Sequence, residues 1–231
     1  MTTYTPHDFY GGAIKALIPQ NWVDASDVRE IPSHQEVFLS RTTLSSQITE
    51  INQRVTDHET ATLDTLIGAH LQTHQLDSDA KAALYHIHDV CDEGDKLEIV
   101  TPPTRVSLGK FSAGIVGYRG VVRVTSPKGR SAARAGSGSG SGSGSGVGLG
   151  LGGAVAGSSS EGQLTSTVTL WYLVVRLVEQ ETDLVVFVNV PREEFEKAGD
   201  LRGLEAEERL AEGLISGLVD GLEVVDWDLF C

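Results

Sequence analysis

The sequence predicts an α+β fold, an α/β/α sandwich in which a mainly antiparallel β-sheet lies between helical layers. Two observations lead to this prediction. Helical patterns occur early and late in the chain, and strand-like runs separated by short turns lie around them. One run, residues 163–180, is apolar on both faces, and such a strand must be covered on both faces. We expect residues 1–231 to form a single domain with one insertion.

The N-terminal part of the chain is expected to contain three strands. Residues 10–18 alternate in the manner of a strand, and residues 35–40 form the next one. Residues 46–55 fit a strand or a helix, and we favour the strand. Between the first two strands, Ser26 is expected to cap a single helical turn, with Asp27 near the positive end of that turn.

Two helices are expected to follow, over residues 60–72 and 76–90. Their apolar side chains recur at helical spacing. These stripes consist of Leu63, Leu66, Ile67 and Leu71 in the first helix and of Ala83, Leu84 and Ile87 in the second. Ser78 or Asp79 is the expected N-cap of the second helix.

The second half of the chain is expected to supply the remaining strands and a last helix. The strands cover residues 96–100 and 104–108, on either side of Pro102 and Pro103, and then residues 114–126, 163–180 and 182–190. The short gap between the last two strands predicts a hairpin with antiparallel pairing. The last helix covers residues 205–222 and should pack through Leu210, Leu214, Ile215 and Leu218.

A glycine- and serine-rich segment at about residues 131–162 is expected to be a disordered loop inserted between two strands. Its composition cannot bury enough surface to offset the entropy lost on ordering. Gly148, Gly150 and Gly153 match the GxGxxG pattern, but they lie inside the repeat and no strand precedes them. We therefore expect no dinucleotide site there.

The charge of the chain limits its partners. The net charge of −14 repels nucleic acid and anionic lipid heads, so neither is expected as a partner. A partner with a basic face fits this surface, and solubility alone also explains the charge. The two distant cysteines, Cys91 and Cys231, fit a reducing compartment. Neither a secretory signal nor a membrane span is visible, and a monomer is the default expectation.

The candidate catalytic and metal-binding residues do not form a recognisable site. His86 and His88 would diverge on a helix, and we expect them to be solvated. His70 and His74 lie four residues apart, but no third ligand follows in a known pattern. Acidic neighbours are expected to raise the pKa of Cys91 rather than activate the thiol. We therefore expect no metal, no cofactor and no catalytic activity.

The most informative polar stretch lies between the first two strands. Its carboxylates are those of Asp24, Asp27, Glu30 and Glu36, and Arg29 is placed to brace them. Two interpretations are open: a capped turn with solvated charges, or a docking edge for the lysines and arginines of a partner. In the second case, each buried charge-assisted hydrogen bond would contribute about 1.5–3 kcal/mol.

The motifs in and around this stretch resemble a known family. YGGAI, DASDVREIP and QEVF, together with YHIHDV, TDLVVFVNVP and the closing VVDWDLF, are similar to the Mog-type Ran guanine nucleotide release factors, which are small nuclear import factors. The resemblance is strongest over residues 9–40 and absent over residues 131–162. It is specific because the N-terminal motif is long and uninterrupted.

The resemblance implies the antiparallel sheet and flanking helices that this family shares with PsbP-like proteins. It also implies binding to the GTPase Ran, promotion of guanine nucleotide release, and a role in nuclear protein import. The nucleus is then the main location and the cytoplasm a second one. The alternatives are a PsbP-like accessory or assembly protein without a GTPase role, and a small-molecule-binding domain.

The resemblance also points to individual site residues. The family's Ran-binding surface is linked to the acidic segment after the first strand, which corresponds here to Asp24, Arg29, Glu30, Gln35 and Glu36. One position departs from the family, because Ser33 stands where an aspartate usually follows the proline. His34 or the additional Asp27 would compensate for part of that loss. Lysine at Glu30 or Glu36 is expected to abolish binding and to leave the fold intact.

Overall fold

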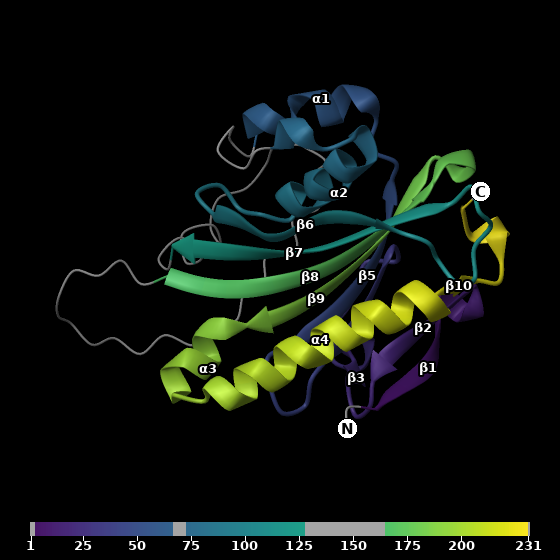
Figure 1. Cartoon of the computed structure of the whole chain (residues 1–231). Coiled ribbons are helices and arrows are strands. Elements are labelled where there is room, and N and C mark those ends of the chain that lie inside the picture. The colour runs from purple at the N-terminus through teal and green to yellow at the C-terminus, as the bar shows by residue number, and fades with distance from the viewer. Residues whose placement is uncertain (1–2, 67–72, 128–164, 231) are drawn as a thin grey trace, which may run out of the picture.

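A computed structural model describes residues 3–66, 73–127 and 165–230 of the chain. In this part, the strands form two antiparallel sheets (Figure 1). The smaller sheet consists, in spatial order, of β1 (Tyr4–Phe9), β2 (Ile14–Pro19) and β10 (Glu223–Val224). The larger sheet consists, in spatial order, of β3 (Val23–Asp24), β4 (Gln35–Leu39), β5 (Ser46–Gln53), β9 (Thr182–Pro191), β8 (Thr165–Leu177), β7 (Val116–Pro127) and β6 (Lys96–Val106).

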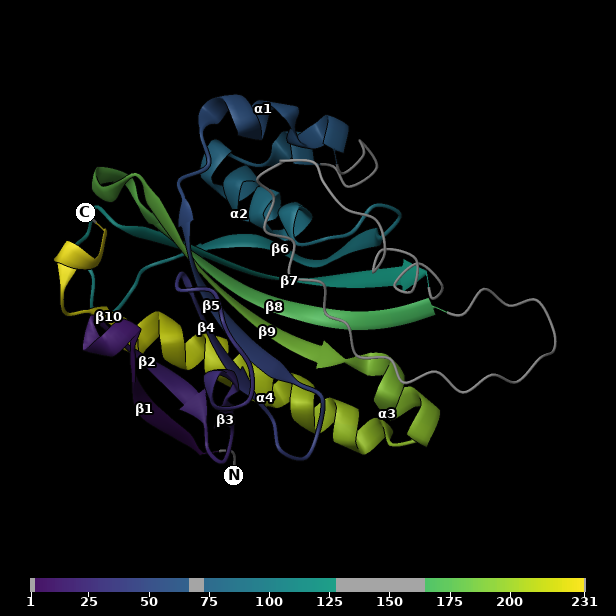
Figure 2. The same cartoon turned by 180° about the vertical axis from the view of Figure 1, so that it is seen from behind.

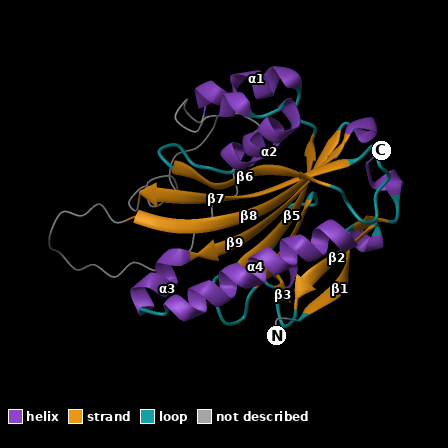
Figure 3. Cartoon of the chain, viewed as in Figure 1, coloured by secondary structure: helices purple, strands orange, loops and turns teal. Residues whose placement is uncertain are grey.

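Helices cover both faces of the larger sheet, as the sequence predicts (Figure 3). The helices α1 (Asp57–Leu66) and α2 (Ser78–Asp89) lie on one face. The long helix α4 (Leu201–Gly221) lies on the other face, next to the smaller sheet. The view from behind shows β1 and β2 beside α4 (Figure 2). A short helix, α3 (Arg192–Ala198), links β9 to α4 and is absent from the sequence prediction. The fold is therefore an α/β/α sandwich in which one outer layer also contains a small sheet.

Strand β8 shows why both faces of the larger sheet must be packed against other elements. Leu173 and Val175 are fully buried on the α4 side, and Tyr172 and Val174 are fully buried on the side of α1 and α2. Burying one such side chain contributes about 1.5–3 kcal/mol, so exposing either face would be costly. The predicted pairing of β8 with β9 is confirmed, and a single turn of helix, η5 (Val178–Gln180), connects them.

The first predicted strand begins later than expected. Residues 10–12 form a short 3-10 turn, η1 (Tyr10–Gly12), and the strand starts at Ile14. The backbone φ angles at Tyr10, Gly11 and Gly12 are 50°, 66° and 97°, which no strand allows. Strand β1 precedes this turn and was not predicted, because its side chains are polar and mostly exposed.

Residues 96–106 form one strand where the sequence predicts two. Strand β6 passes through Pro102 and Pro103 with register shifts between Ile99 and Thr104. Proline lacks a backbone donor, but among the described strands β6 lies at the edge of the sheet and pairs with β7 alone. The prolines therefore interrupt the ladder without ending the strand. By contrast, the prediction of a strand at residues 46–55 is confirmed by β5.

The helix predictions hold for position and fail in detail at the ends. Helix α1 begins at Asp57 rather than residue 60, and Leu66 of its predicted apolar stripe is 45% exposed. The stripe of α2 is confirmed, but Asp77 caps this helix in place of Ser78 or Asp79, by accepting a hydrogen bond from the Ala80 N–H at 2.7 Å.

Helix α4 begins at Leu201, earlier than residue 205. Its buried stripe contains Leu214, Ile215 and Leu218 as predicted, with Ala211 in place of the half-buried Leu210.

Several predicted features lie outside the described residues. These are the glycine- and serine-rich segment at 131–162 with its GxGxxG match, His70, and Ile67 and Leu71 of the first predicted helix. The organisation of residues 1–231 as one domain with an inserted disordered loop stays a prediction.

Candidate functional site

The acidic segment, residues 24–36, leaves the sheet as a tightly held turn. The short helix η2 (Ala25–Asp27) follows β3 directly, and Oδ1 of Asp24 accepts a hydrogen bond from the Ser26 N–H at 2.8 Å. Asp24, and not Ser26, is therefore the N-cap. Ala25 is fully buried, and its carbonyl accepts hydrogen bonds from two following N–H groups at 3.1 and 3.0 Å. The turn is thus fixed to the core at its base.

The middle of the acidic segment faces solvent. Asp27, Arg29, Glu30 and Ser33 are exposed, and His34 is half-buried. The predicted bracing by Arg29 is not formed: among the described residues, no ion pair joins its guanidinium group to a carboxylate. Two exposed carboxylates therefore stand on a rigid turn, which is a suitable geometry for contact with a cationic surface.

The end of the acidic segment turns into the protein. Gln35 opens β4 and is 7% exposed. Its side-chain N–H donates to Oε1 of the buried Glu50 at 2.7 Å, and Asn52 donates to the other oxygen of Glu50 at 3.2 Å. The structure therefore uses the amide of Gln35 inside the sheet.

Glu36 is held by Tyr10, a residue to which the sequence analysis assigned no role. The Tyr10 N–H donates to Oε1 of Glu36 at 2.7 Å. The Tyr10 hydroxyl lies 3.0 and 2.9 Å from the carbonyl oxygens of His34 and Thr49. Burial first, and then the charges of Glu36 and Glu50, raise the pKa of Tyr10, so its hydroxyl stays a proton donor. The motifs YGGAI and QEVF thus meet in space. The feature of the sequence that could have pointed to Tyr10 is a tyrosine before two glycines.

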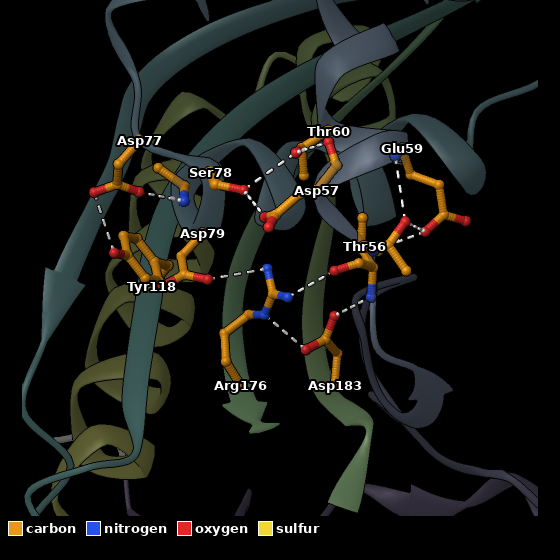
Figure 4. Close-up of polar contacts among 12 residues, drawn as sticks. Thr56, Asp57, Glu59, Thr60, Asp77, Ser78, Asp79, Tyr118, Arg176 and Asp183 are labelled. Carbon is orange, nitrogen blue, oxygen red and sulfur yellow. Dashed lines mark hydrogen bonds and ion pairs between the residues drawn. The ribbon is translucent and has the colours of Figure 1, made fainter. Parts of the chain in front are cut away.

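A second pair of motifs meets in a buried ionic network, of which Figure 4 shows Arg176, Asp183 and Asp79. His86 of YHIHDV is 6% exposed, and its Nε2 lies 2.9 Å from Oδ2 of Asp183 in TDLVVFVNVP. The other oxygen of Asp183 lies 2.9 Å from Nε of Arg176, which also donates to the Val55 carbonyl at 2.7 Å and contacts Asp79 at 3.3 Å. The expectation of a solvated His86 is therefore wrong. Burying a charge is costly unless it is paired, so removing one partner from this network would leave an unpaired buried charge and destabilise the fold.

The remaining candidate groups do not assemble into a catalytic site in the described part of the chain. No three His, Cys, Asp or Glu side chains there are placed to hold a metal ion. Burial first, and then Asp95 and Asp92, raise the pKa of Cys91 to about 12, which leaves the thiol protonated at neutral pH. This confirms the expected direction of the shift. None of the described helices combines the length and apolar character that crossing a membrane requires.

Comparison with known proteins adds to this geometry. The sequence model of the Ran-interacting Mog1 protein family matches residues 7–191. The nuclear import protein MOG1 of Saccharomyces cerevisiae is 24% identical over 96% of this chain and 83% of its own length. The Ran guanine nucleotide release factor of Bos taurus is 36% identical over 35% of this chain and 33% of its own length.

A solved structure has the same fold. The crystal structure of the Saccharomyces cerevisiae Ran-binding protein Mog1p superimposes with a TM-score of 0.54 and 22% identity, covering the whole of both chains. The family model matches most of the sequence, so the chain belongs to the Ran-interacting Mog1 protein family.

Proposed function

We propose that this protein binds the GTPase Ran, promotes the release of guanine nucleotide from it, and supports protein import into the nucleus. The observation that carries the proposal is the family match over residues 7–191, with relatives named as a nuclear import protein and as Ran guanine nucleotide release factors. These names do not favour the alternatives of a PsbP-like accessory protein or a small-molecule-binding domain. We place the protein in the nucleus and, second, in the cytoplasm, as a monomer without nucleic-acid or membrane partners.

The acidic segment is the proposed docking edge for Ran. Asp27 and Glu30 would contact basic side chains of the GTPase, with Arg29, Ser33 and His34 at the border of the contact. Asp24 and Gln35 take a supporting role, because their polar groups are used to cap η2 and to bind Glu50. Glu36 is fixed through Oε1 by Tyr10, while its Oε2 accepts no hydrogen bond within the described residues. A rigid edge loses little conformational freedom on binding, which favours affinity.

The proposed mechanism is thermodynamic linkage rather than catalytic chemistry. A protein that binds nucleotide-free Ran more tightly than loaded Ran must lower the affinity of Ran for nucleotide by the same factor. A preference of about 100-fold corresponds to about 2.7 kcal/mol. The negative surface would in addition speed the encounter with a cationic partner.

The docking assignment predicts that Glu30→Lys weakens Ran binding at least about tenfold, because lysine would repel a cationic surface. The affinity is measured by titration calorimetry with purified nucleotide-free Ran. Glu212→Lys is the matched control, since Glu212 is also exposed but lies on α4. Equal affinities for the two variants would reject the assignment. Glu36→Lys is a poorer test, because it also removes the acceptor of the Tyr10 N–H, so a loss of binding would not separate a lost Ran contact from a local change of the fold.

A further inference from the structure

We propose that Ran also contacts an apolar groove near the acidic segment, and that this groove supplies much of the binding free energy. This inference rests on the proposed function. Exposed ion pairs contribute little to the stability of a complex, so the carboxylates of the acidic segment steer association more than they hold a complex. Stable interfaces have a desolvated apolar core inside a polar rim. The acidic segment has the character of a rim, and the core must lie beside it.

This groove, called the hairpin groove because it adjoins the β8–β9 hairpin, has apolar side chains among polar ones. It is a cleft of about 450 Å³ between the loop that precedes β7, the turn η5, and the C-terminal turn η6 (Trp227–Phe230). Its apolar lining comes from Ile115, Val178 and Trp227. Val178 is 54% exposed and Trp227 is 38% exposed. Tryptophan is among the residue types that most often dominate a protein interface, and here it comes from the closing VVDWDLF motif.

The groove is held in shape without a partner. The Trp227 ring lies 6.3 Å from the Phe111 ring, nearly perpendicular to it, and 6.0 Å from the Phe230 ring. Backbone N–H groups of Val225 and Asp226 donate to the Ala13 carbonyl at 2.8 and 3.1 Å, which anchors the approach to η6. Preorganised apolar surface of this kind binds at low entropic cost.

The rim of the groove is acidic. Glu179 is part of its lining, and Glu181, Asp226 and Asp228 are exposed in the same two turns. The neighbouring loop contributes one exposed cation, Lys110. This charge pattern fits a partner surface that carries an apolar side chain among lysines or arginines. The acidic segment would also bind a positively charged surface.

The hairpin side of the groove is continuous with the acidic segment through the sheet. The Arg54 N–H donates to the Glu181 carbonyl at 2.8 Å at the end of β5. Further along β5, the Ile51 N–H donates to the His34 carbonyl at 2.9 Å. The hairpin of β8 and β9 is therefore one strand away from β5, and β5 is one strand away from the acidic segment. Two strand spacings amount to about 10 Å, and the three residues from Ile51 to Arg54 add about 10 Å along β5.

The C-terminal side of the groove reaches the acidic segment by a second route. Ala13, which accepts the two hydrogen bonds described above, follows η1 directly. Tyr10 of η1 is the residue that binds Glu36. Figures 1 and 2 show η1, η6 and the β8–β9 hairpin at the same end of the molecule. Both surfaces therefore lie toward one end of the molecule, and the proposal requires that one interface of about 800 Å² per partner cover both.

The test measures the affinity of purified nucleotide-free Ran for Trp227→Ala and Val178→Asn. Each variant is expected to raise the Kd at least about tenfold, by the same factor at low and at high salt, because neither changes a charge. The loss of Ran affinity in Glu30→Lys should instead be smaller at high salt. Leu201→Asn is the control, since Leu201 is 65% exposed and lies at the N-terminal end of α4.

The outcomes separate the groove from the proposed function. Val178 lies on an exposed turn, so Val178→Asn reports on binding even if Trp227→Ala disturbs its aromatic neighbours. Suppose that the wild type binds Ran and that Glu30→Lys weakens this binding. If Val178→Asn and Trp227→Ala then bound Ran as tightly as the wild type, the groove proposal alone would be overturned. Failure of the wild-type chain to bind Ran in any nucleotide state would overturn both proposals.

Discussion

Tyr10 is the single residue on which the shape of the acidic segment most depends. Its φ angle of 50° is unfavourable for a side chain with a Cβ atom. Such strain persists only where surrounding contacts fix it, and here the N–H binds Glu36 while the hydroxyl binds the backbone of His34 and Thr49. Tyr10 therefore ties the N-terminal turn to β4 and β5 at the base of the proposed docking edge.

Tyr10→Phe is expected to lower the free energy of unfolding by about 1–2 kcal/mol, because the carbonyl oxygens of His34 and Thr49 lose the hydroxyl proton that they share. Urea denaturation followed by circular dichroism measures this change. Tyr85→Phe serves as the control, since the half-buried Tyr85 makes no hydroxyl hydrogen bond within the described residues. If both variants lost the same stability, the hydroxyl contacts would have no special role.

The sequence predicts the exposed part of the acidic segment and not its buried end. Asp27 and Glu30 are charged residues between strands, and their exposure follows from that position. Gln35 and Glu36 open a strand that is covered on both faces, with Val37 packed toward α1 and α2 and Phe38 packed toward the smaller sheet. Alternation along the strand does not reveal that both faces are covered, so polar residues at its start look exposed from the sequence alone.

At the scale of elements, helix α1 starts with a reciprocal cap that the sequence analysis missed. The Glu59 carboxylate accepts hydrogen bonds from the N–H and the hydroxyl of Thr56 at 2.7 and 2.8 Å, and the Thr56 hydroxyl accepts from the Glu59 N–H at 3.3 Å (Figure 4). The backbone hydrogen bond from Thr56, followed by the one from its side chain, lowers the pKa of Glu59 below its ordinary value of 4.5. This capping box explains why α1 begins at Asp57.

Glu59→Gln is expected to lower the free energy of unfolding at pH 7 by about 0.5 kcal/mol, the lower part of the range for caps because the site is partly exposed. A lowered folded-state pKa stabilises the fold above 4.5, and this contribution is lost as the pH falls through the lowered value. The difference between wild type and variant should therefore shrink below pH 4.5. Urea unfolding across this pH range tests it, with Glu212→Gln as control. A difference that stayed constant with pH would contradict the assignment.

Periodicity predicts the elements that pack against the core and misses those at the margins. The stripes of α2 and α4 and the two apolar faces of β8 are buried. Buried positions require apolar side chains, so these elements leave a periodic pattern in the sequence. Strand β1 is polar at an edge, and α3 is a short link. For these elements the tertiary context decides the structure, so local pattern carries little information.

Across the whole molecule, residues far apart in sequence converge, as two pairs illustrate. His86 and Asp183 meet in the buried network, and Tyr10 and Glu36 meet below the docking edge. No local pattern predicts such pairs, since only the sheet order brings their segments together. The same topology places the acidic segment and the hairpin groove at one end of the sheet, where the proposed Ran contacts gather.

The rate at which fluorescent guanine nucleotide leaves Ran reports directly on the proposed release activity. Loaded Ran is mixed in a stopped-flow instrument with excess unlabelled nucleotide and increasing amounts of this protein. The account predicts that the off-rate rises with protein concentration to a plateau, and that Glu30→Lys shifts the curve to higher concentrations. An off-rate that stays at the value of Ran alone, at a concentration that saturates binding, would contradict it.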